Sequence, residues 1–156
     1  MKVLVIYYSQ TGHTKKMAQL VAEGVKSSGV DVELKDVQEV KAEELLRFQG
    51  IIIGSPTYYG TMAYQIKRLF DESVRFHEEL TGKVGAAFAS SANIGGGNET
   101  TILEIIHAML IHGMIVQGDA TGDHYGPVAI GAPDARASTQ CIRLGEKVAN
   151  LVMKLK

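Results

Sequence analysis

The sequence predicts an α/β fold in which helices cover both faces of a five-stranded parallel sheet. Two observations lead to this prediction. Short β-branched, apolar runs alternate along the chain with longer segments whose apolar residues recur every three or four positions. Several of the short runs are almost wholly apolar, as is typical of strands that are buried on both faces of a parallel sheet. Regular alternation of strand and helix predicts a doubly wound sheet, for which we expect the strand order 2-1-3-4-5.

The predicted strands are all short. They are Val3–Tyr8, Val30–Leu34, Ile51–Gly54, Val84–Ala89 and Met114–Gln117. Polar and apolar residues alternate in the second of them, so we expect it at an edge of the sheet. Between the strands, apolar stripes with helical spacing occupy Met17–Val25, Ala63–Val74, Ile102–Met109 and Cys141–Val152, and a weaker helix is expected over Ala42–Phe48.

Composition limits the class of protein. The 156 residues contain no repeat or linker, so we expect a single domain over residues 1–156. The 16 Lys and Arg residues balance 17 Asp and Glu residues, which argues against a basic surface for nucleic acid or for an anionic membrane. The one cysteine excludes an intramolecular disulfide and sites built from several thiolates, and no metal site is predicted. With neither a signal segment nor an apolar run of membrane-spanning length, a cytoplasmic location is expected.

The first candidate loop follows the first strand and consists of Ser9, Gln10, Thr11, Gly12, His13 and Thr14. Its hydroxyls, its glycine and the start of the next helix together suit a phosphate group. The loop lacks the lysine of a GxxxxGK[ST] motif and the spacing of GxGxxG. The alternative is a helix start that Thr11 caps.

Two further loops follow the third and fourth strands. The second loop is Pro56, Thr57, Tyr58, Tyr59 and Gly60, and the third is Ser90, Ser91, Ala92, Asn93, Ile94, Gly95, Gly96 and Gly97, before a helix that we expect Asn98 to cap. Two adjacent tyrosines could stack on a flat ligand, or they could simply cover the end of the sheet. Three successive glycines indicate close backbone approach, or a flexible turn. Because these strands are neighbours in the expected order, the three loops predict one site for a mononucleotide with a flat ring.

The loops carry motifs that resemble those of flavodoxin-like FMN proteins, and most closely those of the WrbA-type NAD(P)H:quinone oxidoreductases. Ser9–Thr14 matches the flavodoxin phosphate loop [ST]-x-T-G-x-[ST]. The WrbA-type patterns YYS-x-x-GH, PT-x-[FY]-G-x-M, GGG-x-E-x-T-I and HGM correspond to Tyr7–His13, Pro56–Met62, Gly95–Ile102 and His112–Met114. The family's late P-Y-G segment corresponds to residues 124–126, although Tyr125 follows His124 here rather than proline. The short connection Val37–Gly50 lacks the insertion of longer members.

The resemblance implies a cofactor and a reaction. It implies bound FMN, NAD(P)H as electron donor, a quinone as acceptor and a homo-oligomer, either dimer or tetramer. It also implies that His112 lies near the flavin, and that Tyr59, His112 and Tyr125 shape the substrate pocket. No catalytic side chain is expected, because the cofactor carries the redox chemistry. The long segment Asp119–Arg136 could form a lid.

Two other functions are possible for a protein with these loops. One is an electron carrier without a substrate site, for which a strongly acidic surface is expected; the net charge of −1 argues against it. The other is a phosphate-binding regulatory domain. It would need acidic residues after the first and third strands, where the chain has Tyr8-Ser9 and Ser55-Pro56 instead.

Overall fold

The computed structural model describes all residues, 1–156, and contains one parallel sheet at its centre. The strands β1 (Lys2–Tyr7), β2 (Asp31–Asp36), β3 (Gly50–Tyr58), β5 (Val84–Ser91) and β6 (Ile115–Val116) lie in the order β2-β1-β3-β5-β6. This is the predicted order, and the alternating segment β2 lies at an edge as expected. Two short strands were not predicted: β4 (Thr61–Met62) pairs antiparallel with β3, and β7 (Val128–Ile130) pairs with β5.

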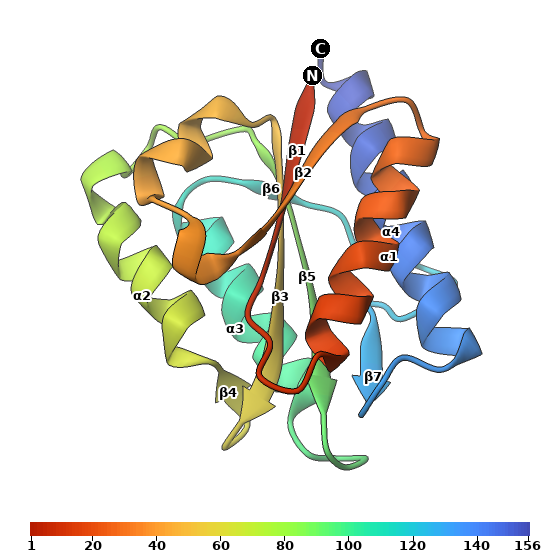
Figure 1. Ribbon diagram of the computed structural model, residues 1–156. Helices are drawn as coiled ribbons and strands as arrows, with labels where there is room; N and C mark the ends of the chain where they lie inside the picture. The colour runs from red at the N-terminus through yellow and green to blue at the C-terminus, as the bar shows by residue number, and fades with distance from the viewer.

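Helices cover both faces of the sheet (Figure 1). The helices α1 (His13–Ser27) and α4 (Ala135–Lys154) pack on one face, and α2 (Tyr64–Glu72) and α3 (Asn98–Ile111) pack on the other. Short 3₁₀ turns occupy Val37–Glu39, Ala42–Arg47 and Ser73–Phe76, so the weak helix expected before the third strand is a 3₁₀ helix. No helix is both long and apolar enough to cross a membrane.

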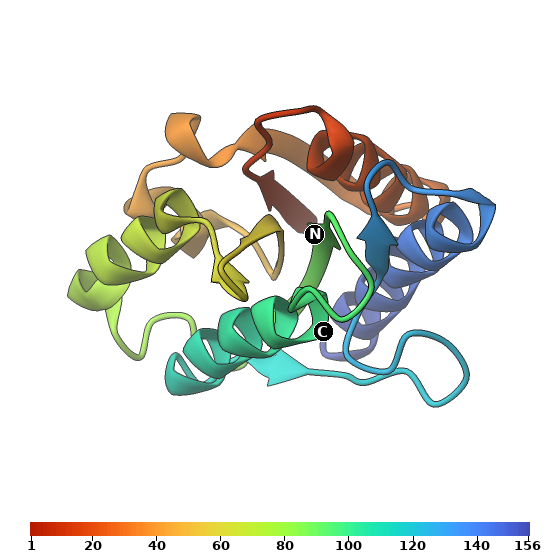
Figure 2. The same cartoon turned by 90° about the horizontal axis from the view of Figure 1, so that it is seen from below.

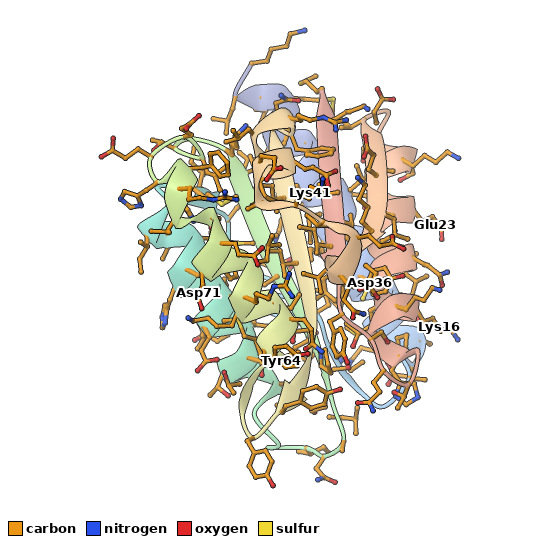
Figure 3. All side chains as sticks on the ribbon, turned by 60° about the vertical axis from the view of Figure 1, so that its left-hand side comes forward. Lys16, Glu23, Asp36, Lys41, Tyr64 and Asp71 are labelled. Atoms are coloured by element: carbon orange, nitrogen blue, oxygen red, sulfur yellow. The ribbon has the colours of Figure 1, made fainter.

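The central strands are buried on both faces, which explains their apolar sequences. In β1, Val3 and Val5 point into the core beneath α1 and α4, whereas Leu4 and Ile6 point into the core beneath α2 and α3. The helices bury only one side each. Their outer faces carry exposed charged side chains such as Lys16, Glu23 and Asp71 (Figure 3). The residues of both cores therefore follow the same patterns that predicted the elements, with a period of 2 in the strands and of 3.6 in the helices.

The fifth predicted strand, Met114–Gln117, is only partly correct. In the structure β6 pairs with the start of β5, at Val84 and Gly85, and the chain then leaves the sheet. It returns as β7, which pairs with the end of β5 at residues 89–91. At the return, a Cβ on Gly126 would lie 2.0 Å from the Ala87 carbonyl oxygen, so this close approach requires glycine.

The segment between β6 and α4, expected as a lid, is tied to α4 by charged groups. The Asp119 carboxylate accepts from the Thr121 N–H at 2.9 Å and from Arg143 at 2.9 and 3.0 Å. The bond from the Thr121 N–H and the charge of Lys147 hold the pKa of Asp119 well below its usual range. Arg136 donates to both oxygens of Asp123, at 2.7 and 2.9 Å. These bonds fix the segment rather than leaving it free.

Candidate functional site

The three candidate loops meet at the carboxyl edge of the sheet, opposite the edge where both chain ends lie (Figure 1). Figure 2 looks onto this edge and shows the ends of β1, β3, β5 and β7 side by side. The Tyr58 hydroxyl donates to Gln10 Oε1 at 3.1 Å and so joins the second loop to the first. The hydroxyls of Thr14 and Ser90 lie 2.9 Å apart and join the first loop to the third. The expected convergence of the loops is therefore present in the structure.

The first loop, Ser9–Thr14, presents free backbone N–H groups. The N–H of Gly12 donates to Ser9 Oγ at 3.1 Å, whereas those of His13, Thr14 and Lys15 donate to no protein acceptor. A Cβ added to Gly12 would meet nothing within 4 Å, so the space in front of the loop is open. Free N–H groups at the positive end of a 15-residue helix form a site suited to an anion such as phosphate.

The hydroxyls of the first loop differ in their surroundings. Thr11 is exposed and caps nothing, because the N-cap of α1 is Gly12, with φ of 91°, so the alternative in which Thr11 caps the helix is wrong. Thr14 is buried, and its hydroxyl bonds to that of Ser90. Thr11 is thus free to contact a ligand, whereas Thr14 also holds the first loop against β5.

The second loop, Pro56–Gly60, is a continuation of β3 that turns back as a hairpin with β4. Tyr59 and Gly60 occupy the two central positions of the turn with φ of 51° and 79°, the combination found in type I′ hairpins. A positive φ strains a bulky residue such as tyrosine. The Tyr59 side chain is fully exposed. A strained, exposed aromatic side chain at the tip of the hairpin is poorly explained by packing within this chain.

Tyr58, in contrast, is held in place. Its ring packs edge-on against Tyr8, with ring centroids 6.5 Å apart and an interplanar angle of 74°. Burial raises the pKa of the Tyr58 hydroxyl above its usual value, and the neighbouring Tyr8 adds to the effect. Of the two adjacent tyrosines, Tyr58 therefore packs against the carboxyl edge of the sheet, whereas Tyr59 extends into solvent.

The third loop, Ser90–Gly97, begins within β5 and ends at α3. Ser90 and Ser91 are the last residues of β5, and Ala92, Asn93, Ile94, Gly95 and Gly96 are exposed. Gly97 is the N-cap of α3, with φ of 98°, and Asn98 is the first helical residue, so the expected cap at Asn98 is wrong. A Cβ on Gly97 would lie 2.6 Å from the Cα of Gly60. The second and third loops therefore touch through two glycines.

The structure places His112 far from these loops. His112 follows the last residue of α3, whereas the third loop precedes the first residue of this helix. The 14 residues of α3 span about 21 Å and separate the two. Ser73 donates its hydroxyl hydrogen to the Phe70 carbonyl, so it accepts the Nε2–H of His112 at 2.8 Å. Burial and the nearby His77 lower the pKa of His112. The expectation that His112 lies beside the ring is wrong for the site of its own chain, because a helix after a parallel strand runs back to the opposite edge.

No hydrogen bond or ring contact joins Tyr125 to the site. Tyr125 precedes β7 and is half-exposed. Its role in a substrate pocket stays a prediction. A hollow of about 550 Å³ does adjoin the third loop, between Ile94 and the residues Val128, Ile130 and Arg136. This volume lies within the usual range for a small-molecule site.

Sequence reasoning missed two contributors to the edge. The first is Gly131, which directly follows β7; its N–H donates to the Ser91 carbonyl at 2.8 Å, and a Cβ there would lie 3.8 Å from the His13 ring. The second is the first two turns of α3, where Thr100 and Glu104 bond to the hairpin. Thr100 occupies a variable position of the quoted GGG-x-E-x-T-I motif and Glu104 lies beyond it, so the motif gave no signal for either residue. Gly131 could not be predicted, because the last strand is divided into β6 and β7 and the second part was not expected.

Comparison with known proteins agrees with this geometry. The family model described as Flavodoxin matches residues 5–112. A "Flavodoxin" of Aquifex aeolicus is 42% identical, over 97% of this chain and 86% of the relative. An "NAD(P)H dehydrogenase (quinone)" of Archaeoglobus fulgidus is 33% identical over 188 aligned residues, which cover 99% of this chain and 98% of the relative. That alignment is longer than this chain, so the relative has segments that are missing here.

A solved structure is also similar. The crystal structure of the flavodoxin, WrbA-like protein from Agrobacterium tumefaciens superposes with a TM-score of 0.84, at 26% identity, over 99% of each chain. The two kinds of name among the relatives, flavodoxin and quinone dehydrogenase, are the same two functions that the loop sequences suggested.

Proposed function

Because this chain belongs to the flavodoxin family, we propose that the carboxyl edge of its sheet binds FMN, with the phosphate on the first loop and the flat ring against the second and third loops. The row of free N–H groups at His13, Thr14 and Lys15 is the observation that carries this proposal. A dianionic phosphate would accept from these groups without needing a lysine or arginine. Gly12 leaves room for it, because a side chain there would point into the open space.

We further propose that the chain is an NAD(P)H:quinone oxidoreductase. When bound, FMN supplies the two-electron chemistry by which a nicotinamide donor reduces a quinone. Donor and acceptor must each stack against the ring within about 3–3.5 Å, so one face has to stay open. Tyr59 supports an open face, since its side chain extends into solvent instead of folding back over the edge. The net charge of −1 also lacks the strong acidity expected of a carrier that docks on basic partners.

The chain's own residues would bind and orient rather than transfer protons. Gln10 accepts a hydrogen bond from the Tyr58 hydroxyl and thereby fixes the position of the Tyr58 ring. The buried pair of Thr14 and Ser90 holds the first loop at a constant distance from the third. None of these groups is an activated nucleophile, and none needs to be, because the reaction takes place on the cofactor.

The second candidate is an electron carrier, which the name of the Aquifex relative favours. Initial-rate kinetics separate the two functions. If NAD(P)H and benzoquinone use one open face in turn, double-reciprocal plots at several quinone concentrations are parallel. Intersecting lines would reject the shared face. An absence of turnover with both NADH and NADPH, in protein that binds FMN, would favour the carrier.

The homo-oligomer remains part of the proposal. Val74 and Ile111 line one hollow on the α2 and α3 face and are exposed, with exposed fractions of 67% and 72%. Together they form an apolar surface that a second copy of this chain would cover. Light scattering at high protein concentration tests this point, and a monomer under all conditions would contradict it.

A further inference from the structure

The first two turns of α3 form hydrogen bonds along one side of the hairpin that carries Tyr58 and Tyr59. Thr100 Oγ1 donates to the Gly60 carbonyl oxygen, which lies 2.7 Å away. One turn further along, Glu104 Oε2 accepts from the Thr61 hydroxyl and, at 3.4 Å, from the Met62 N–H. Positions four apart lie on the same face of a helix, so both side chains reach the same hairpin.

These hydrogen bonds join the hairpin to the third loop as well as to the helix. The Thr100 hydroxyl also lies 2.8 Å from the carbonyl oxygen of Gly97, which ends the third loop. A hydroxyl has one hydrogen, so this hydrogen is shared between the carbonyls of Gly60 and Gly97. The two glycines are already in contact, as the 2.6 Å from a Cβ on Gly97 to the Cα of Gly60 shows. Thr100 therefore bridges the second and third loops at their point of contact.

The turn needs such support because its backbone is strained. Tyr59 has φ of 51°, and no packing of its fully exposed side chain compensates for the strain. A two-stranded hairpin whose second strand has only two residues has little stability of its own. The contacts from α3, which also include a bond from Thr101 to the Thr57 hydroxyl at 3.2 Å, thus support the turn on one side, and the Tyr58–Gln10 bond supports it on the other.

We propose that Thr100 and Glu104 are positioning residues, which set the placement of the second loop against the third and thereby the site for the flat ring. This inference rests on the proposed function, since the two loops are the proposed walls for the ring of FMN. Neither residue needs to touch the cofactor. Loss of either should loosen the ring site without affecting the phosphate site on the first loop.

The test compares two pairs of variants with a control. Thr100→Val removes the hydroxyl and keeps the shape of the side chain, while Thr100→Ser restores a hydroxyl. Glu104→Ala removes the acceptor, while Glu104→Gln keeps one. Thr139→Val is the matched control, because Thr139 is an exposed helical threonine whose hydroxyl bonds only to the Ala135 carbonyl of its own helix, at 3.0 Å.

Two measurements are made on each variant: hydrogen exchange of residues 57–62 in the flavin-free protein, and affinity for FMN and for riboflavin. In Thr100→Val and Glu104→Ala we expect faster exchange in the hairpin and affinities for both flavins that fall by the same factor, about 3- to 10-fold. The serine and glutamine variants and the control should behave like the wild type.

Three results would overturn the proposal. They are unchanged exchange in both Thr100→Val and Glu104→Ala, unchanged flavin affinity in both, or a loss of affinity for FMN alone, which would connect these residues to the phosphate. Failure of the wild type to bind either flavin would refute the proposed function instead. The exchange measurement on flavin-free protein would still decide whether the two residues hold the hairpin.

Discussion

Replacing Gly97 by alanine tests whether the second and third loops are in contact. Two effects add in this variant. Alanine at φ of 98° is in a left-handed conformation, which costs about 1–2 kcal/mol. Its Cβ would also lie 2.6 Å from the Gly60 Cα, so one backbone must move, at a further cost of about 1–3 kcal/mol. We therefore expect Gly97→Ala to lower the free energy of unfolding by about 2–5 kcal/mol.

Gly29→Ala is the matched control, because it separates strain from contact. Gly29 has φ of 80° in the connection between α1 and β2, and a Cβ there would meet nothing within 4 Å. It should lose only the conformational cost, about 1–2 kcal/mol. Urea unfolding of the two variants without flavin measures the difference. If Gly97→Ala were destabilised no more than Gly29→Ala, the close approach of the loops would be refuted.

Three further predictions concern single residues. Thr11→Ala should weaken FMN binding by about 10-fold and leave riboflavin binding unchanged, since the proposed site puts the phosphate, which riboflavin lacks, on the loop that carries Thr11; equal weakening of both in a fluorescence titration would disprove this. Asp119→Ala should lower the free energy of unfolding by about 1.5–3 kcal/mol at pH 7. Because the pKa of Asp119 is lowered in the folded state, its stabilisation is complete above the unfolded pKa, about 3.9, and is lost as pH falls further; denaturant titrations should show wild type and variant converging below about pH 4, and a constant gap would refute the assignment. The Cys141 thiol, whose pKa burial raises to about 12, should not react with a thiol reagent at pH 8 until the protein unfolds; rapid labelling of the native protein would contradict its place in the core.

The parts of the fold that could be predicted from the sequence depend on patterns within one segment. The apolar run of β1 is buried on both faces, and the alternating residues of β2 lie at the edge, so periodicity was sufficient for both. The last strand is different, because β6 and β7 have only two and three residues and their pairing depends on distant β5. Local sequence contains no signal for a strand that is divided by a loop.

The site shows the same distinction. The convergence of the three loops follows from strand order alone, and the structure contains it. The position of His112 could not be obtained from its motif, because a motif records which residues occur and not which end of α3 they occupy. The tie between Thr100 and Gly60 joins residues 40 positions apart, so no local pattern reveals it. The caps at Gly12 and Gly97 were missed because left-handed glycines replaced the usual side-chain caps at both helix starts.

The most direct test of the proposed oxidoreductase is anaerobic stopped-flow mixing of the FMN-loaded protein, first with NADH or NADPH and then with benzoquinone. The proposed function predicts that one of the two donors bleaches the flavin absorbance at least as fast as steady-state turnover, with one donor consumed per flavin. It also predicts that quinone then restores the absorbance in a single phase. Flavin that stays oxidised with both donors, yet is reduced by a strong chemical reductant in two separate one-electron steps, would contradict it and identify an electron carrier.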